Sequence, residues 1–408
     1  MTKDEIVAAL TRKRAGDARW QEGRTFSLVY DGGPGVNEVA EAAAQMFLHE
    51  NALNTKAFPS LAELQSEVVG ACAGLLHAPD GAAGFMTSGG TESILLAVKA
   101  ARERGRERGV SAPEMVVAES AHAAFHKAAQ LFDVRVHTTR VGADWRADVD
   151  AMAALVNENT VFVAGSAVQY PQGVIDPIPE IAALAASVDA WMLDACMGGF
   201  ILPFMELNGE RLPPWDFRVP GVMSMSIDVH KLGYAPKGSS VIVHASKALR
   251  RYQTFVFDGW LGGLYASPNI QGSRSGLPLA TAWAVMHHLG IDGYRELTRV
   301  TVDAARRLVA GVRAIPGLTV LGEPDAHVFT ISTRPDEPDA IDVFVLGDAL
   351  LKKGWLLDRQ TPPDSLHATV SAANVPNVDA FLADLAECAD RARTARTDDR
   401  STTYATLE

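Results

Sequence analysis

The 408-residue sequence is short of several residue types and patterns, and each shortage excludes a class of protein. Its three cysteines, Cys72, Cys196 and Cys388, lie far apart, so a disulfide framework and a zinc site are excluded and a reducing compartment is expected. No run of ~18 apolar residues appears that could span a bilayer, and the N-terminus has no basic-then-apolar signal arrangement. A cytoplasmic location is therefore expected.

Positive charge is also scarce. Lysine and arginine number 37 against 49 aspartates and glutamates, which gives a net charge of -12 at pH 7. That sign opposes binding to nucleic-acid phosphates or to anionic lipid. The alternating charges between Arg102 and Arg108 are typical of a solvated helix end, so no nucleic-acid partner is expected.

The overall composition is that of a globular protein. Hydrophobic residues make up 48% and charged residues 21% of the chain, which excludes a disordered or fibrous protein. Because a single core stops growing near ~250–300 residues, this length predicts more than one domain. We expect an N-terminal arm at residues 1–55, a large domain at 56–290 and a small C-terminal domain at 291–408.

Short β-branched runs alternate with helical stretches from about residue 84 to 245. The expected strands cover residues 115–118, 134–137, 161–164, 191–193, 223–227 and 241–243. Strand, helix, strand repetition predicts an α/β fold with a mostly parallel sheet and helices on both faces. Beyond residue 290, a long amphipathic helix over 294–312 and strands near 318–320, 328–331 and 366–370 predict a smaller α+β domain.

A glycine-rich turn at residues 87–93 lies between an apolar segment and a helix. Glycines let backbone N–H groups approach an anion, and the helix N-terminus adds partial positive charge, so the turn indicates a phosphate site. An ordinary capped helix start, with Ser88 or Thr91 as the cap, is the alternative. The turn lacks the spacing of a nucleotide P-loop and of a dinucleotide fingerprint, which indicates a different phosphate ligand.

Three further side chains follow expected strands. Asp194 precedes a run of small residues at a strand end, where ligands of α/β sheets bind, although a turn residue is the alternative. Lys231 follows a later strand and is either a surface charge or a desolvated amine of lowered pKa suited to carbonyl chemistry. His122 alone would be a helix-terminal or core histidine. In this chain order, the combination indicates a pyridoxal 5′-phosphate (PLP) site.

From about residue 50 to 370 the chain resembles PLP enzymes of the aspartate-aminotransferase fold type, fold type I. Within it, the chain is similar to the group of amino-acid decarboxylases and sphingosine-1-phosphate lyases, and the lyase branch is nearer. The motifs that carry the resemblance are TSGGTESIL (87–95), SAHAAF (120–125), GVIDP (173–177), DACMGGF (194–200), HKLGYAPKG (230–238), GGLYASP (262–268) and GSR (272–274).

The resemblance implies roles for these residues. Lys231 would form a Schiff base with PLP, Asp194 would pair with the pyridine nitrogen and His122 would stack on the ring. The cofactor-binding set would also include residues near the phosphate and the ring of PLP, namely Gly90, Thr91, Ser166, His230 and Gly263. No metal ion is expected. The family is typically a homodimer, and the loop with Gly263 would reach the partner's phosphate.

For the lyase branch, the implied reaction is retro-aldol cleavage of a phosphorylated 2-amino-3-hydroxy substrate to an aldehyde and an amine such as phosphoethanolamine. Tyr30 and Lys237 would bind the substrate phosphate or assist proton transfer, and Tyr404 matches a late tyrosine of the family.

The chain departs from the lyase pattern at one motif. Lyases carry an Asn-Pro-Leu-His stretch where this chain reads Asn51-Ala52-Leu53-Asn54, and Asn54 cannot titrate near neutrality. A smaller or more polar substrate is therefore an alternative. So is α-decarboxylation of an amino acid, because the cofactor motifs provide the electron sink without selecting the bond that breaks.

Overall fold

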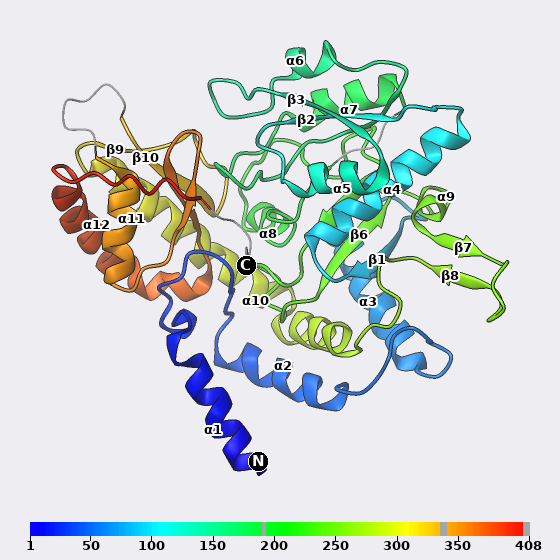
Figure 1. Cartoon of the computed structure of the whole chain (residues 1–408), viewed down its shortest axis with the longest axis horizontal. Helices are drawn as coiled ribbons and strands as arrows, with labels where there is room; N and C mark the ends of the chain where they lie inside the picture. Colours follow the sequence, from blue (N-terminus) through cyan, green and yellow to red (C-terminus); the bar gives the residue numbers. More distant parts are fainter. Residues whose placement is uncertain (190–192, 335–340, 403–408) are drawn as a thin grey trace.

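The computed structural model describes residues 1–189, 193–334 and 341–402 (Figure 1). The helices are α1 Lys3–Lys13, α2 Pro34–Met46, α3 Pro59–Leu75, α4 Gly90–Glu107, α5 Ala124–Phe132, α6 Val149–Ala153, α7 Ile178–Ser187, α8 Leu202–Leu207, α9 Lys247–Arg250, α10 Leu277–Ala314, α11 Val343–Lys352 and α12 Val378–Ala392. The strands are β1 Ala83–Thr87, β2 Glu114–Ala118, β3 Arg135–Thr139, β4 Thr160–Val163, β5 Ser224–Ile227, β6 Ser240–His244, β7 Phe255–Phe257, β8 Tyr265–Ser267, β9 Leu318–Val320, β10 Val328–Thr333, β11 Asp358–Gln360 and β12 Ser365–Thr369.

The central sheet is mostly parallel, as predicted. Strands β3, β2 and β4 pair in parallel, and β1, β6 and β5 form a second ladder in which β6 is antiparallel to both neighbours. The chain at Asp194 joins the two ladders by parallel bridges to Ser166 and Ser226. Of the strand expected at 191–193, the first two residues lie outside the described residues, and Leu193 is not part of a strand.

Both faces of this sheet are buried because successive side chains of a strand point to opposite sides. Met115 and Val117 of β2 pack with the apolar residues of α4 and α5. Val116, between them, packs with residues of α3, α7 and α10 on the other face. The β-branched runs of the sequence therefore form strands that are covered by helices on both faces of the sheet.

The C-terminal domain is α+β, as predicted, with an antiparallel sheet in the order β11, β12, β10, β9. Phe329 and Ile331 of β10 belong to a core shared with α10, α11 and α12. The side chains on the other face of this sheet are polar and also buried, among them Thr330 of β10 and His367 of β12. The Thr330 hydroxyl donates to the carbonyl of Pro171, so this polar face meets the domain that carries the central sheet.

Helix α10 joins the two domains (Figure 1). The predicted helix at 294–312 is its second half, and the structure extends it back to Leu277 across a break at Gly290. Gly290 has φ +54°, a left-handed conformation that glycine adopts without a side-chain clash. The helix changes direction at this residue.

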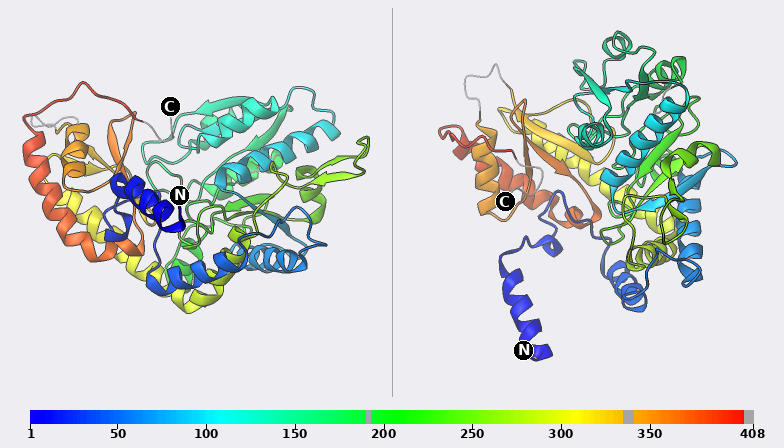
Figure 2. Two further views of the ribbon diagram at one scale, coloured as in Figure 1. Left: turned by 60° about the horizontal axis from the view of Figure 1, so that its bottom comes forward. Right: turned by 45° about the vertical axis from the view of Figure 1, so that its right-hand side comes forward.

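The N-terminal residues contact the rest of the chain unevenly. Helix α1 buries none of its side chains and projects away from the other elements (Figure 2). Phe26, by contrast, packs on Trp355 and Phe381 in the C-terminal core. The division at residues 55 and 290 stays a prediction. Across the described ranges, no helix combines the length and the apolar character needed to cross a membrane.

Candidate active site

Asp194 lies in the middle of the central sheet. Its Oδ1 accepts hydrogen bonds from the Ser226 hydroxyl at 2.8 Å and from the Cys196 backbone N–H at 2.9 Å. The residue is 8% exposed. The bridge to Ser166 holds its backbone on the other side. The carboxylate is therefore fixed in direction and largely shielded from water.

Lys231 lies in the loop between β5 and β6, with its Nζ 2.9 Å from Oδ2 of Asp228. The other Asp228 oxygen accepts a hydrogen bond from the Ser240 hydroxyl at 2.5 Å. Burial alone would raise the pKa of Asp228, but the charge of Lys231 and the Ser240 hydrogen bond help to lower it to about 2.

The sequence suggested a lowered pKa for the amine of Lys231, and the structure shows this to be wrong. Burial does act to lower the pKa of Lys231, but the adjacent Asp228 carboxylate outweighs it, so the pKa lies above its ordinary value. The amine is therefore held as an ammonium ion in this arrangement. Asp228 is not among the residues expected from the sequence, because only the fold shows that it contacts the lysine.

Two imidazoles lie near this ion pair. Burial lowers the pKa of His122, the positive charge of Lys231 adds to the effect, and Asp194 and Asp228 oppose it. Burial likewise lowers the pKa of His230 to about 4. Both rings are therefore neutral at physiological pH. Nδ1 of His230 is buried without a hydrogen-bond partner.

The glycine-rich turn meets these groups at the start of α4. A Cβ added at Gly90 would lie 2.6 Å from Sγ of Cys196 and 3.0 Å from Oδ2 of Asp228. A Cβ added at Gly89 would lie 3.5 Å from Cε1 of His230. Only glycine fits at Gly90, and Gly89, at the start of the helix, lies beside the imidazole ring of His230.

Lys237 and Tyr30 lie together, although they are 207 positions apart in the sequence. The ammonium of Lys237 is 4.7 Å from the centre of the Tyr30 ring and donates to the His230 carbonyl at 3.0 Å. Loss of surrounding water and the nearby charge of Lys231 lower the pKa of Lys237 to about 8. The two residues offer a cation and a phenol beside the Lys231 loop.

The other expected site residues lie at different distances from this cluster. Ser166 pairs with Asp194, and Thr91 is exposed in the first turn of α4. Gly263 is in the exposed β7–β8 hairpin, where an added Cβ would meet no atom within 4 Å. Tyr404 lies outside the described residues.

The polar face of the C-terminal sheet contributes residues that the sequence did not indicate. His327 and His367 are fully buried, and the positive charge of Lys231 helps burial to lower the pKa of each to about 3. The His367 ring stacks on Tyr170 at 3.9 Å. Tyr170 and His122 both line a cavity of about 1000 Å³ between the two domains. His327 directly precedes β10 and His367 lies within β12, so in the sequence both look like residues of the domain core.

Together these residues can hold an anion, a ring with a protonated nitrogen and a reactive carbonyl group. The turn at Gly90 and the free nitrogen of His230 suit a phosphate, and Asp194 suits a protonated ring nitrogen. Lys231 carries the primary amine with which an aldehyde condenses, after its ammonium group has lost a proton.

Comparisons with known proteins show the family to which the chain belongs. The model of the pyridoxal-dependent decarboxylase conserved domain matches residues 19–329. A sphingosine-1-phosphate lyase of Arabidopsis thaliana is 41% identical over 396 residues, covering 95% of this chain and 72% of that protein. The structure of a Burkholderia pseudomallei sphingosine-1-phosphate lyase superposes with a TM-score of 0.91 at 38% identity, covering 96% of this chain and 92% of that one.

A Lactobacillus brevis glutamate decarboxylase shares the fold, with a TM-score of 0.83 at 22% identity, covering 97% of this chain and 94% of that one. The cofactor of the family is PLP, and the donor set described above fits its phosphate, ring nitrogen and aldehyde. The chain belongs to the pyridoxal-dependent decarboxylase family, and within it to the PLP-dependent lyases that resemble sphingosine-1-phosphate lyase.

Proposed function

We propose that the chain cleaves the C2–C3 bond of a 2-amino-3-hydroxyalkyl 1-phosphate of the sphingosine 1-phosphate type. The 3-hydroxyl loses its proton, the C2–C3 bond breaks, C3 leaves as an aldehyde, and C2 gains a proton to give phosphoethanolamine. The observation that carries the proposal is the buried cluster of Lys231, Asp228, Asp194 and His122, together with the nearby cation of Lys237.

Bound PLP supplies the electron sink for the broken bond. Asp194, held by Ser226 and Cys196, would keep a proton on the ring nitrogen. His122 is neutral, so its imidazole can lie against the ring without adding a positive charge. Asp228 holds Lys231 in its charged form, which makes Nζ of Lys231 the proposed proton donor to C2.

We place the cofactor phosphate at Gly90 and Thr91, with His230 beside them. The substrate phosphate is assigned to Lys237 with Tyr30, because this pair offers a cation and a phenol beside the Lys231 loop. The inter-domain cavity at His122 and Tyr170 is the proposed path for the rest of the substrate.

We also propose a homodimer with shared sites. The β7–β8 hairpin is apolar and exposed, and it projects from the edge of the molecule (Figure 1). Its exposed side chains are Phe255, Val256, Phe257, Trp260, Leu261 and Leu264. Such a patch is typical of a protein interface. Gly263, in the same hairpin, would then lie at the partner's phosphate site. A cytoplasmic location stays a prediction.

The test is a product analysis. The PLP-loaded protein is incubated with phosphorylated and unphosphorylated 2-amino-3-hydroxy compounds and with amino acids, and aldehyde and carbon dioxide are measured separately. We expect aldehyde and phosphoethanolamine from the phosphorylated long-chain substrate, and neither product from the Lys231→Ala variant. Carbon dioxide from an amino acid, with no aldehyde from any compound, would contradict the lyase proposal and support decarboxylation.

A further inference from the structure

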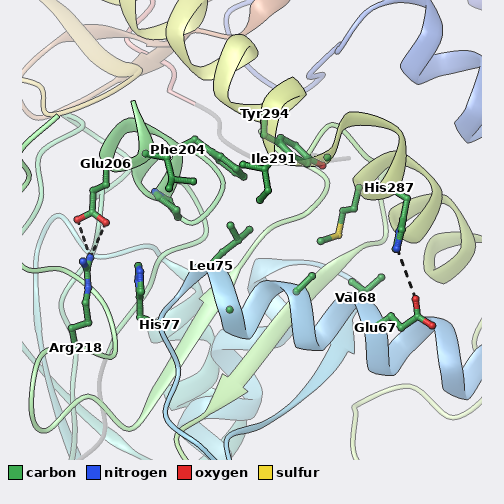
Figure 3. A pocket seen from close by; sticks show the side chains of 16 residues that line it. Glu67, Val68, Leu75, His77, Phe204, Glu206, Arg218, His287, Ile291 and Tyr294 are labelled. Carbon is green, nitrogen blue, oxygen red and sulfur yellow. Dashed lines mark hydrogen bonds and ion pairs between the residues drawn. The ribbon is translucent and has the colours of Figure 1, made fainter. Parts of the chain in front are cut away.

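A second cavity, of about 750 Å³, lies between α3, α8 and the bend of α10 (Figure 3). Neither Lys231 nor Asp194 nor His122 lines it. Most of its wall is apolar, and the principal apolar side chains are Val68, Ala71, Leu75, Phe204, Met286 and Ile291. Its volume is within the range of small-molecule sites, roughly 300–1,000 Å³. The apolar wall suits an aliphatic chain.

Charged groups stand at the two ends of this wall (Figure 3). At one end the Glu67 carboxylate accepts a hydrogen bond from Nε1 of Trp283 at 2.6 Å and lies 3.9 Å from Nε2 of His287. The Glu67 side chain is 55% exposed, so it has room for another partner. At the other end Arg218 contacts both Glu206 and the buried Asp216.

The carboxylates therefore outnumber the guanidinium at the cavity, and the net charge favours a cationic head group over an anionic one. At the Arg218 end, His77, Glu206 and Asp216 have ligand atoms within 4.8 Å of one another. The guanidinium already donates to both carboxylates there, so this end does not need a metal ion. Glu67, at the opposite end of the cavity, is therefore the carboxylate that we assign to the ligand.

The cavity also contacts the loop of the reactive lysine. Tyr294 lines it and stacks on Phe204 at 5.0 Å. The Tyr294 hydroxyl donates to the carbonyl of Gly233 at 2.8 Å, two residues after Lys231. Tyr294 follows Gly290, where α10 bends between the domains. A molecule bound against the Tyr294 ring would therefore contact the side chain that is hydrogen-bonded to the Lys231 loop.

We propose that this cavity binds a long-chain alkylammonium molecule, with the chain along α3 and α10 and the cation at Glu67, and that binding stiffens the Lys231 loop through Tyr294. The site is separate from the proposed substrate path, and it does not depend on the proposed reaction.

The test uses the PLP-loaded protein and decyltrimethylammonium, which has no N–H and so cannot react with an aldehyde. Binding is measured by calorimetry, with decanoate as the anionic comparison. We expect one site per chain and weaker binding of decanoate. Ala71→Trp fills the cavity and should weaken binding at least about tenfold, because several CH₂ contacts are lost. Ala62→Trp, on the same helix but outside the cavity, is the matched control and should bind like the wild type.

Glu67→Gln should weaken binding of the cation by about threefold, the size expected of an exposed charge pair, and leave decanoate unchanged or tighter. Hydrogen exchange of the amides of residues 231–235 should slow on binding in the wild type and less in Tyr294→Phe. No binding at millimolar concentration, equal binding by Ala71→Trp, or equal affinity for decanoate would overturn the site. Binding with unchanged exchange would overturn its link to the Lys231 loop.

Discussion

At the scale of single residues, the pair formed by Lys231 and Asp228 decides the chemistry of the site. Asp228 is 2% exposed in its side chain and Lys231 18%. Two charges in such a position stabilise the protein only as a pair, since either one alone would be buried without a partner. The same pair keeps the amine charged and fixed in position.

The first prediction concerns Lys231→Ala. We expect loss of the visible absorption of bound PLP and no borohydride-stable link to the cofactor. In the apoprotein, the free energy of unfolding should fall by about 3 kcal/mol, because Asp228 remains buried and charged. Chemical denaturation measures this, with Lys247→Ala on the exposed α9 as the control. Adding Asp228→Asn should restore part of the stability, and failure to do so would count against the ion pair.

The second prediction concerns the pH dependence of phosphate binding. Lys237 is charged below its pKa of about 8 and neutral above it. Inhibition by phosphoethanolamine, the proposed product, should therefore weaken as the pH rises through about 8. In Lys237→Gln the inhibition should be weaker throughout and should lack this transition, while Lys127→Gln on α5 should keep the wild-type profile. An unchanged profile in Lys237→Gln would remove Lys237 from the phosphate site.

At the scale of secondary-structure elements, the first turn of α4 is shaped by its contacts with β5 and the Lys231 loop. The glycine turn could be read from the sequence as an anion site or as a helix cap. The structure shows that Gly90 lies against Cys196 and Asp228, which leaves no room for a side chain. The same element also brings Gly89 to His230.

The third prediction is that Gly90→Ala weakens PLP binding at least tenfold and lowers the melting temperature, since the added methyl must displace Cys196 or Asp228. Gly70→Ala is the matched change within α3, where an added Cβ meets nothing within 4 Å. It should raise the free energy of unfolding by about 0.5–1 kcal/mol. Fluorescence titration with PLP measures the cofactor affinity of each variant, and thermal unfolding measures its stability. Wild-type PLP affinity in Gly90→Ala would argue against the cofactor phosphate lying at this turn.

At the scale of the whole molecule, two features matter: the contact between the two domains and the exposed β7–β8 hairpin. The polar face of the C-terminal sheet forms one side of the inter-domain cavity. Helix α10, which contributes to both domains, fixes their relative orientation. The β7–β8 hairpin presents its apolar side chains to solvent in the single chain. A partner subunit would remove them from water.

The fourth prediction tests that partner. Leu261→Lys should convert the proposed dimer to a monomer, because a charge would be buried at the interface. Light scattering measures the mass, and Leu131→Lys, on an equally apolar but isolated exposed position of α5, should leave it unchanged. If the wild type itself is a monomer, the shared-site proposal fails. The monomeric variant should also bind PLP more weakly, since Gly263 would no longer reach a second chain.

Much of the fold could be predicted because it depends on local pattern. The β-branched runs became strands, and the alternation along β10 separates the core of the C-terminal domain from its polar face. The break of α10 at Gly290 and the antiparallel direction of β6 were not predicted. Both depend on how distant elements pack, which no short window of sequence contains.

The sequence by itself indicated the order of strands and helices, and it made the glycine turn, Asp194, Lys231 and His122 candidate residues of a PLP site. Only the tertiary structure paired Lys231 with Asp228 and brought Lys237 to Tyr30. Those contacts raise the pKa of Lys231, against the expectation from the sequence, and lower the pKa of Lys237. The reason is that the energy of a charge depends on its neighbours in space and on the water around it.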